Sequence, residues 1–130
     1  MKGLAIGLDF DGTVVTHEYP EIGKDIGAVP VLKKLVENDC LLLLNTMRSR
    51  KNGTLQAAEK WFEENGLPLY GINKNPGQEK WTDSTKTYCN LYIDDAALGC
   101  PVKHDGNGRR YVDWEKVEDM LTKMGIIKAE

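Results

Sequence analysis

The chain has few cysteines, no long apolar run and no excess of positive charge, and each of these shortages excludes a class of protein. Its longest apolar run falls far below the roughly 20 residues that cross a bilayer, so no membrane span is predicted. The three cysteines, Cys40, Cys89 and Cys100, lack the spacing of a metal site. Their odd number, without a secretory signal, indicates a reducing compartment. We therefore predict a cytoplasmic protein that does not bind membranes, with Cys40 and Cys89 as buried free thiols.

The charge balance also argues against a broad nucleic-acid-binding surface, because the net charge is −3. Short basic runs at residues 48–51 and 109–110 could still form a local patch, so nucleic acid is left open as a substrate. At 130 residues, with 41% hydrophobic and 28% charged residues, the chain fits one domain, 1–130, with its own core. Repeats, linkers and low-complexity segments are lacking.

Apolar runs alternate with helical patterns, which predicts an α/β fold with a central parallel sheet. The predicted strands are residues 4–9, 40–45, 67–72 and 88–94, and the predicted helices are residues 29–37, 55–65 and 114–124. The sequence DGNG predicts a hairpin between residues 102–104 and 110–112. The expected fold class is therefore a three-layer, Rossmann-type sandwich, followed by a C-terminal hairpin and helix.

Local signals sharpen this prediction at several positions. Thr54 is expected to cap the second helix. In the third helix, Val117, Met120, Leu121 and Met124 recur at helical spacing and are all predicted to be core residues. Residues 73–85 carry too many polar and turn residues for a regular element.

Two aspartates follow the first predicted strand at a spacing suited to catalysis. Asp9 and Asp11 stand where an apolar run ends and Gly12 turns the chain, so their side chains point the same way from extended backbone. Ligands of open α/β sheets bind at the carboxyl ends of the strands. Paired carboxylates there can hold a hard cation and supply a nucleophile and a proton shuttle. An EF-hand calcium loop shares the D-x-D-G pattern, but its later ligands are absent.

Other strand ends add matching groups. Asp94 and Asp95 close the apolar run at residues 91–93, Thr46 ends the run at residues 40–45, and Lys86 precedes the second acidic pair. Carboxylates, a hydroxyl and an ammonium together suit a phosphate ester bound next to Mg²⁺.

Taken in order, these residues resemble the four motifs of the haloacid dehalogenase (HAD) superfamily, whose members are mostly phosphatases. Residues 9–13 (DFDGT) resemble the first motif, Thr46 the second, Lys86 the third and residues 94–95 the fourth. The resemblance covers roughly residues 3–95, and the segment after the first motif is similar to small, capless HAD-like hydrolases of bacteria and phages. The gaps between the motifs leave no room for a cap domain, so we expect an open site.

The resemblance also implies a role for each motif residue. Asp9 would attack phosphorus and form an aspartyl phosphate, and Asp11 would act as general acid and base. Asp9, the backbone carbonyl of Asp11 and the Asp94 carboxylate would bind Mg²⁺. Thr46 would donate to a phosphoryl oxygen, and Lys86 would neutralise charge in the transition state.

Two assignments near the acidic pair stay open. Asp95 either ligates the metal through water, holds Lys86, or caps the following turn. Lys74 and Lys80 compete with Lys86 for the role of active-site cation, although the spacing of Lys86 to Asp94 matches the family better.

Two segments beside the motifs also allow two interpretations each. His17 and Tyr19 either recognise the leaving group of the substrate or belong to a surface loop. Arg48 and Arg50 either bind a second anionic group or are solvated.

The predicted function is a Mg²⁺-dependent phosphomonoester hydrolase. Its substrate would be a phosphorylated small molecule or an exposed phosphate on a larger molecule. The alternatives are a binding protein on a HAD scaffold with weak or no turnover, and a phosphotransferase. An oligomer is compatible with all three.

Overall fold

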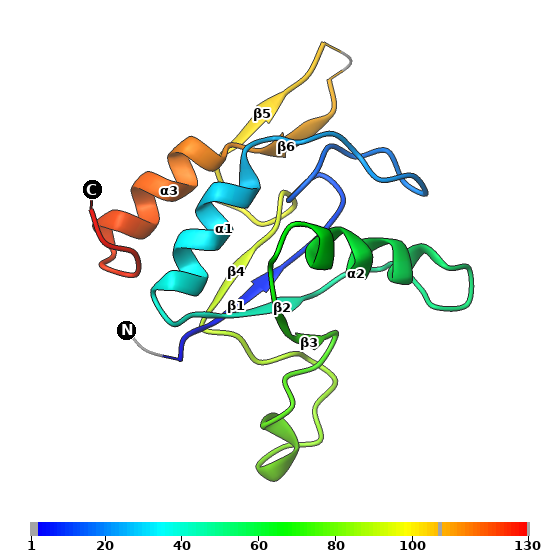
Figure 1. The fold of residues 1–130 in the computed structure, drawn as a ribbon, viewed down its shortest axis with the longest axis vertical. Helices are drawn as coiled ribbons and strands as arrows, with labels where there is room; N and C mark the ends of the chain where they lie inside the picture. The colour runs from blue at the N-terminus through cyan, green and yellow to red at the C-terminus, as the bar shows by residue number, and fades with distance from the viewer. Residues whose placement is uncertain (1–2, 107, 130) are drawn as a thin grey trace.

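The chain forms a parallel sheet with helices packed over it (Figure 1). The computed structural model describes residues 3–106 and 108–129. The sheet has the order β3-β2-β1-β4, and each neighbouring pair is parallel. Its strands are β1 (Ala5–Leu8), β2 (Leu41–Leu44), β3 (Leu69–Ile72) and β4 (Leu91–Ile93). The α/β class and the parallel sheet are thus confirmed, and each strand lies inside its predicted range.

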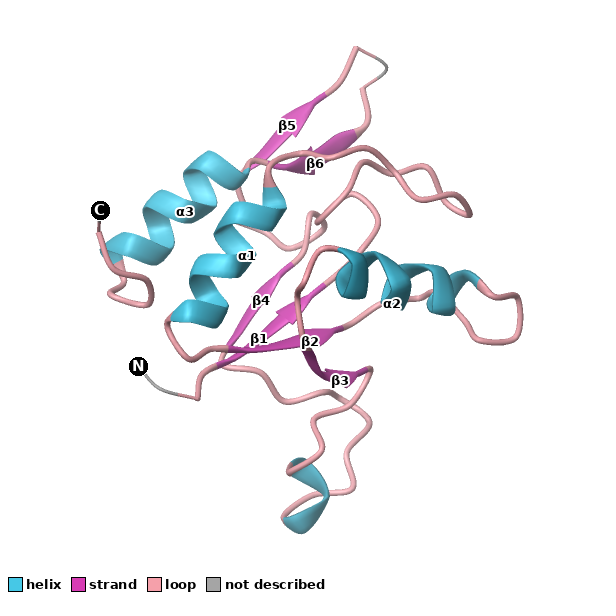
Figure 2. Cartoon of the chain, viewed as in Figure 1, coloured by secondary structure: helices cyan, strands magenta, loops and turns pink. Residues whose placement is uncertain are grey.

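Three helices connect or follow these strands (Figure 2). They are α1 (Ala28–Glu37), α2 (Thr54–Glu64) and α3 (Trp114–Lys123). Pro30 lies in the first turn of α1, where a missing N–H costs no intrahelical bond. Between β3 and β4 the chain is irregular apart from one turn of 3₁₀ helix, η1 (Gln78–Lys80), as its polar composition predicts.

All three helices cover the same face of the sheet. Alternate strand residues enter one large core together with the apolar faces of the helices. These strand residues are Ile6, Leu8, Leu42, Leu44 and Ile93. On the other face, the described residues 3–106 and 108–129 form a small cluster of Ala5, Leu43 and Cys89. The prediction of a three-layer sandwich requires a helix there, but the connection from β3 to β4 supplies an irregular segment instead.

Three local predictions need correction. Thr54 is the first residue of α2 rather than its cap; the cap position is Gly53, whose φ of 79° favours glycine. The Thr54 hydroxyl instead accepts a hydrogen bond from the Ser49 backbone N–H at 3.0 Å. Met120 in α3 and Met124 directly after it are 45% and 48% exposed, because only the side of the helix that carries Val117 and Leu121 is buried.

The predicted hairpin is confirmed, and it docks against the loop that follows β1. Its strands, β5 (Val102–His104) and β6 (Arg110–Val112), pair antiparallel; residue 107 of the predicted turn lies outside the described residues. The Val112 backbone N–H donates to the Gly12 carbonyl at 3.0 Å, and the buried indole of Trp114 donates to the Thr13 carbonyl at 2.7 Å. The C-terminal segment therefore positions the loop of the first motif.

Two predictions from composition are also answered. Cys40 and Cys89 are buried free thiols, as expected. No helix in residues 3–106 or 108–129 is apolar and long enough to span a membrane.

Candidate active site

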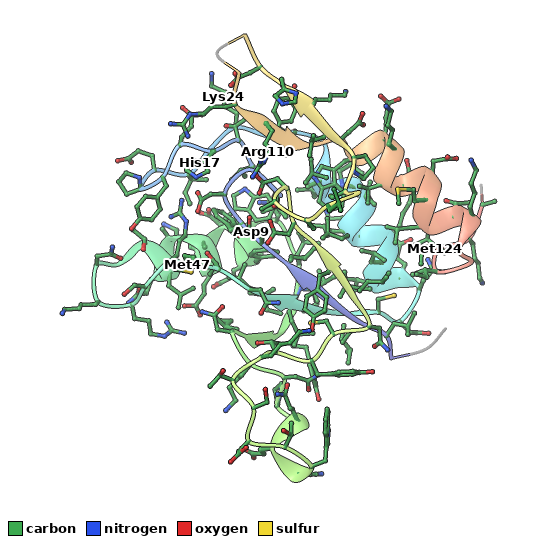
Figure 3. The ribbon with its side chains drawn as sticks, turned by 180° about the vertical axis from the view of Figure 1, so that it is seen from behind. Asp9, His17, Lys24, Met47, Arg110 and Met124 are labelled. Atoms are coloured by element: carbon green, nitrogen blue, oxygen red, sulfur yellow. The ribbon has the colours of Figure 1, made fainter. Side chains whose placement is uncertain are left out.

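The aspartates that follow β1 and β4 meet at one edge of the sheet. Leu8 pairs with Ile93 in parallel register, so the residues after each strand leave the sheet side by side. One carboxylate oxygen from each of Asp9, Asp94 and Asp95 lies within 4.8 Å of the other two. Figure 3 shows Asp9 at the end of its strand, facing the region of Arg110. We call these three residues the acidic triad; Asp95, whose role the sequence left open, belongs to it.

The remaining residues of the DFDGT motif support this triad. The Thr13 hydroxyl lies 3.0 Å from an Asp9 oxygen and 3.1 Å from an Asp95 oxygen, and it accepts the Asp95 backbone N–H at 3.1 Å. With a single proton, it donates to one carboxylate at a time. Gly12 has a φ of 80°, and a Cβ there would lie 3.1 Å from the Asp95 carboxyl carbon. Glycine is therefore required where the loop passes the triad.

The surroundings of Asp9 shift the pKa of its carboxyl group. Burial, and then the negative charge of Asp94, raise the pKa of Asp9 from 3.8 to about 7, while the hydrogen bond from Thr13 opposes the shift. Carboxylates crowded in this way are relieved by a cation. Their hard oxygen donors match the ligands that Mg²⁺ takes in proteins, so the residues present fit this metal.

Asp11 lies in a very different environment, although it stands only two residues from Asp9. Both of its oxygens accept from Arg48, at 2.9 Å from Nε and 2.6 Å from Nη2. The same guanidinium donates to the carbonyls of Pro20, Glu21 and Thr54. These five bonds use all five N–H groups of an arginine.

The side chain of Arg48 is fully buried. Its hydrogen bonds connect the motif loop at Asp11, the loop at residues 20–21 and the first residue of α2. Its guanidinium carbon also lies 4.8 Å from the centre of the Phe10 ring and 5.3 Å from that of Tyr19. Of the two interpretations of Arg48, binding a second anionic group or solvation, the structure bears out neither. Arg50, by contrast, is exposed and forms an ion pair with Glu59.

A cleft of about 510 Å³ opens over the triad. Besides the triad it is lined by Asp11, His17, Tyr19, Thr46, Met47, Arg48, Ala96 and Arg110. The Arg110 Nε donates to Asp95 at 3.0 Å, and its side chain is 51% exposed. The Thr46 hydroxyl accepts the Arg48 backbone N–H at 3.1 Å and keeps its own proton to donate. The structure thus brings Thr46 and His17 to the same cleft as the triad.

Lys86 is exposed and does not line this cleft, and neither do Lys74 and Lys80. The Lys86 ammonium lies 5.6 Å from the centre of the Tyr92 ring. Tyr92 pairs with Gly7 of the neighbouring strand. Residues two apart in a strand face the same side of the sheet, so Gly7 and Asp9 are on one side. The ammonium thus contacts a strand residue two positions before Asp94 rather than a residue of the triad.

Sequence reasoning missed the contacts that two arginines of the site make. Arg48 binds the Asp11 carboxylate and three backbone carbonyls from two other segments of the chain, and no sequence pattern predicts such partners. Arg110 belongs to a basic pair that the sequence does show, within a hairpin that it also predicts. What stayed hidden was the docking of that hairpin on Gly12 and Thr13, which carries Arg110 to Asp95.

The whole chain is similar to the solved structure of a conserved protein from Bacteroides thetaiotaomicron. The two are 31% identical, the match covers 99% of this chain and 100% of that chain, and the TM-score is 0.76. The chain belongs to the family of that conserved protein. No family model matches the chain, and no curated protein matches it. The family membership extends the fold to a bacterial relative and attaches no activity to it.

Proposed function

We propose that the chain is a Mg²⁺-dependent phosphatase that hydrolyses phosphomonoesters through an aspartyl phosphate on Asp9. The observation that carries this proposal is the acidic triad at adjacent strand ends, in a cleft that also holds an arginine and the Thr46 hydroxyl. The resemblance of the four motifs to those of HAD phosphatases supports it. The short segments between the motifs also support a site that no cap domain covers.

In the first half-reaction, an Asp9 oxygen attacks phosphorus, and the bond from phosphorus to the leaving oxygen breaks. Asp11, which must first leave Arg48 and take up a proton from solvent, gives that proton to the leaving oxygen. The Thr13 hydroxyl, 3.0 Å from Asp9, holds the attacking carboxylate in place. Arg110 and Thr46 line the cleft where the phosphoryl oxygens would lie, and their N–H and O–H groups are suited to these acceptors.

In the second half-reaction, Asp11 takes a proton from water, which attacks phosphorus and releases phosphate from Asp9. Because Arg48 binds both Asp11 oxygens, at least one of these bonds must lengthen before Asp11 reaches the substrate. The ion pair with Arg48 therefore defines the resting position of Asp11, which Asp11 leaves in order to act on the substrate.

The carboxylates of Asp9, Asp94 and Asp95 would hold Mg²⁺, because their oxygens lie close together. When bound, it would shield the repulsion between the triad and an anionic substrate. The chain's own contribution is to hold the carboxylates together through Gly12 and Thr13.

Hydrolysis of para-nitrophenyl phosphate, measured with Mg²⁺ and after complete chelation, tests the proposal. We expect turnover that depends on the metal, and an Asp94→Asn variant that remains folded but needs far more Mg²⁺ to reach its maximal rate. Turnover that survives chelation would contradict the metal role, and the lack of any turnover with Mg²⁺ would contradict the phosphatase itself.

A further inference from the structure

A second cleft lies directly beside the candidate active site. It measures about 570 Å³ and is lined by the loop after β1 and by residues of the β5–β6 hairpin. His17 and Tyr19 line both clefts, so the two spaces adjoin along these side chains. In Figure 3 the labelled residues lead from Asp9 past Arg110 and His17 toward Lys24, which lines the second cleft.

Two consecutive arginines of the hairpin serve the two clefts. Arg110 lines the first cleft and donates to Asp95. Arg109 lines the second, where its Nη1 lies 2.9 Å from the His17 Nδ1 and donates to the His17 carbonyl at 3.4 Å. Successive residues of extended chain point to opposite sides, which explains why one arginine turns to each cleft.

The second cleft presents hydrogen-bond donors. A guanidinium can only donate, so the Nδ1 of His17 accepts from Arg109, and the ring proton of His17 lies on Nε2. Within residues 3–106 and 108–129, the Arg109 Nε and Nη2 and the Lys24 ammonium have no hydrogen-bond partner. Donors from three side chains therefore remain available to a ligand.

Acidic residues also line this cleft, but each is bound within its own segment. They are Glu18, Asp25 and Asp105. They accept, in this order, from the Thr16 hydroxyl at 2.9 Å, the Gly27 backbone N–H at 2.9 Å and the Arg109 backbone N–H at 3.2 Å. Their oxygens are thus partly satisfied, whereas the cationic side chains are the groups with donors to spare.

We propose that the substrate carries a second phosphate on its leaving group, which Arg109, His17 and Lys24 bind while the first phosphate lies at the triad. This inference rests on the proposed function, since it extends the substrate of that same site. A phosphate offers several oxygens to converging N–H donors, and a guanidinium pairs with it through two parallel bonds. The substrate class is a small molecule with two separate phosphate groups.

The test compares three probes that share one nucleoside: adenosine 3′,5′-bisphosphate, adenosine 5′-monophosphate and adenosine 3′-monophosphate. Binding to the Asp9→Asn variant with Mg²⁺ is measured by calorimetry, which needs no turnover. We expect the bisphosphate to bind roughly tenfold tighter or more than either monophosphate, as one added charge-assisted hydrogen bond can supply. Adding Arg109→Ala to this variant should remove most of the preference for the bisphosphate. Lys24→Gln should also reduce the preference, and it provides a second test if the Arg109→Ala protein does not fold. Arg50→Ala, an arginine outside both clefts, should leave the preference unchanged.

The outcomes separate this inference from the phosphatase proposal. If wild-type protein hydrolyses para-nitrophenyl phosphate with Mg²⁺ but the three probes bind alike, the second phosphate is wrong and the phosphatase stands. If the bisphosphate is preferred through Arg109 but no ester is hydrolysed, the second cleft does bind a phosphate, but the phosphatase is wrong and the bisphosphate is a ligand rather than a substrate. A preference that survives both Arg109→Ala and Lys24→Gln would also overturn the inference, because the second phosphate would then lie elsewhere.

Discussion

Asp9 and Asp11 belong to one five-residue motif, yet the structure surrounds them with opposite charge. Asp9 lies among carboxylates, with Asp94 and Asp95 close enough to share a cation. Asp11 lies against a fully buried arginine that binds both of its oxygens. The same residue type, two positions apart, is thus set up for two different tasks.

The difference teaches how the fold assigns these tasks. Burial, and then crowding by Asp94, raise the pKa of Asp9 to about 7, so a cation at the triad is needed to keep a nucleophilic carboxylate there. Asp11 is tied through Arg48 to the carbonyls of Pro20 and Glu21, so its position depends on the loop that lines the cleft. One aspartate is governed by the sheet edge, and the other by the loops.

Substitution at either aspartate gives the largest expected effect on turnover. Asp9→Asn should abolish hydrolysis of para-nitrophenyl phosphate, because an amide cannot form the acyl phosphate. Asp11→Asn should slow it by roughly 10²–10⁴-fold, the usual cost of losing an acid and base. Steady-state rates and circular dichroism on both variants provide the measurement. If Asp9→Asn kept a near-normal rate while Asp11→Asn was inactive, the two roles would be reversed.

The Arg48→Ala substitution removes the contacts that tie Asp11 to the loops, and it is expected to have the next largest effect. It leaves the Asp11 carboxylate and three carbonyls without their buried donor, so we expect a loss of about 3–5 kcal/mol in the free energy of unfolding. Urea denaturation measures it. Arg50→Ala is the matched control, because its ion pair with Glu59 is exposed and worth at most about 1 kcal/mol. A loss below that of the control would show that the cluster around Arg48 contributes little to stability.

The environment of Asp9 at the sheet edge can be tested by varying the pH. The pKa of Asp9 is raised to about 7, so between about pH 4 and pH 7 the folded, metal-free chain binds more protons than the unfolded chain. The contribution of Asp9 to stability is therefore fully present below about pH 4 and is lost as the pH rises through 7. Because Mg²⁺ displaces this proton, its affinity should rise by up to about tenfold per pH unit below pH 7.

Thermal melts and Mg²⁺ titrations between pH 5.5 and 8.5 check this prediction. Asp9→Asn should flatten the pH dependence of the metal-free melting temperature. A Mg²⁺ affinity that did not change with pH would contradict competition between a proton and the metal for the Asp9 carboxylate.

Much of the fold follows from the sequence because its signals are local. Short apolar runs predict the strands β1 and β2, and the turn sequence DGNG predicts the hairpin that follows β4. The number of layers is not local. It depends on whether the connection between β3 and β4 forms a helix over the second face. The polar composition of residues 73–85 predicts irregular chain there, and irregular chain leaves the sheet with helices on one face only.

The site divides in the same way. Asp9 and Asp94 could be placed together, because adjacent parallel strands deliver their following residues to one edge. The contacts of Arg48 and Arg110 could not, because they depend on how loops and the hairpin dock. Lys86 is an intermediate case: its spacing to Asp94 matches the family resemblance, but the structure places its ammonium against Tyr92.

Lys86 gives the smallest effect that still separates two interpretations. If its side chain reaches past Gly7 to the triad when substrate binds, Lys86→Ala should lower turnover by roughly tenfold to a hundredfold, below the cost of removing a group that directly stabilises the transition state. It should also move the acid limb of the pH–rate profile upward, because a cation near Asp9 lowers its pKa. Lys74→Ala and Lys80→Ala, which lie in or beside the polar segment at η1, are the matched controls and should change neither quantity. If Lys86→Ala behaves like these controls, its ammonium only packs on Tyr92, and Arg110 is the cation that the acidic triad relies on.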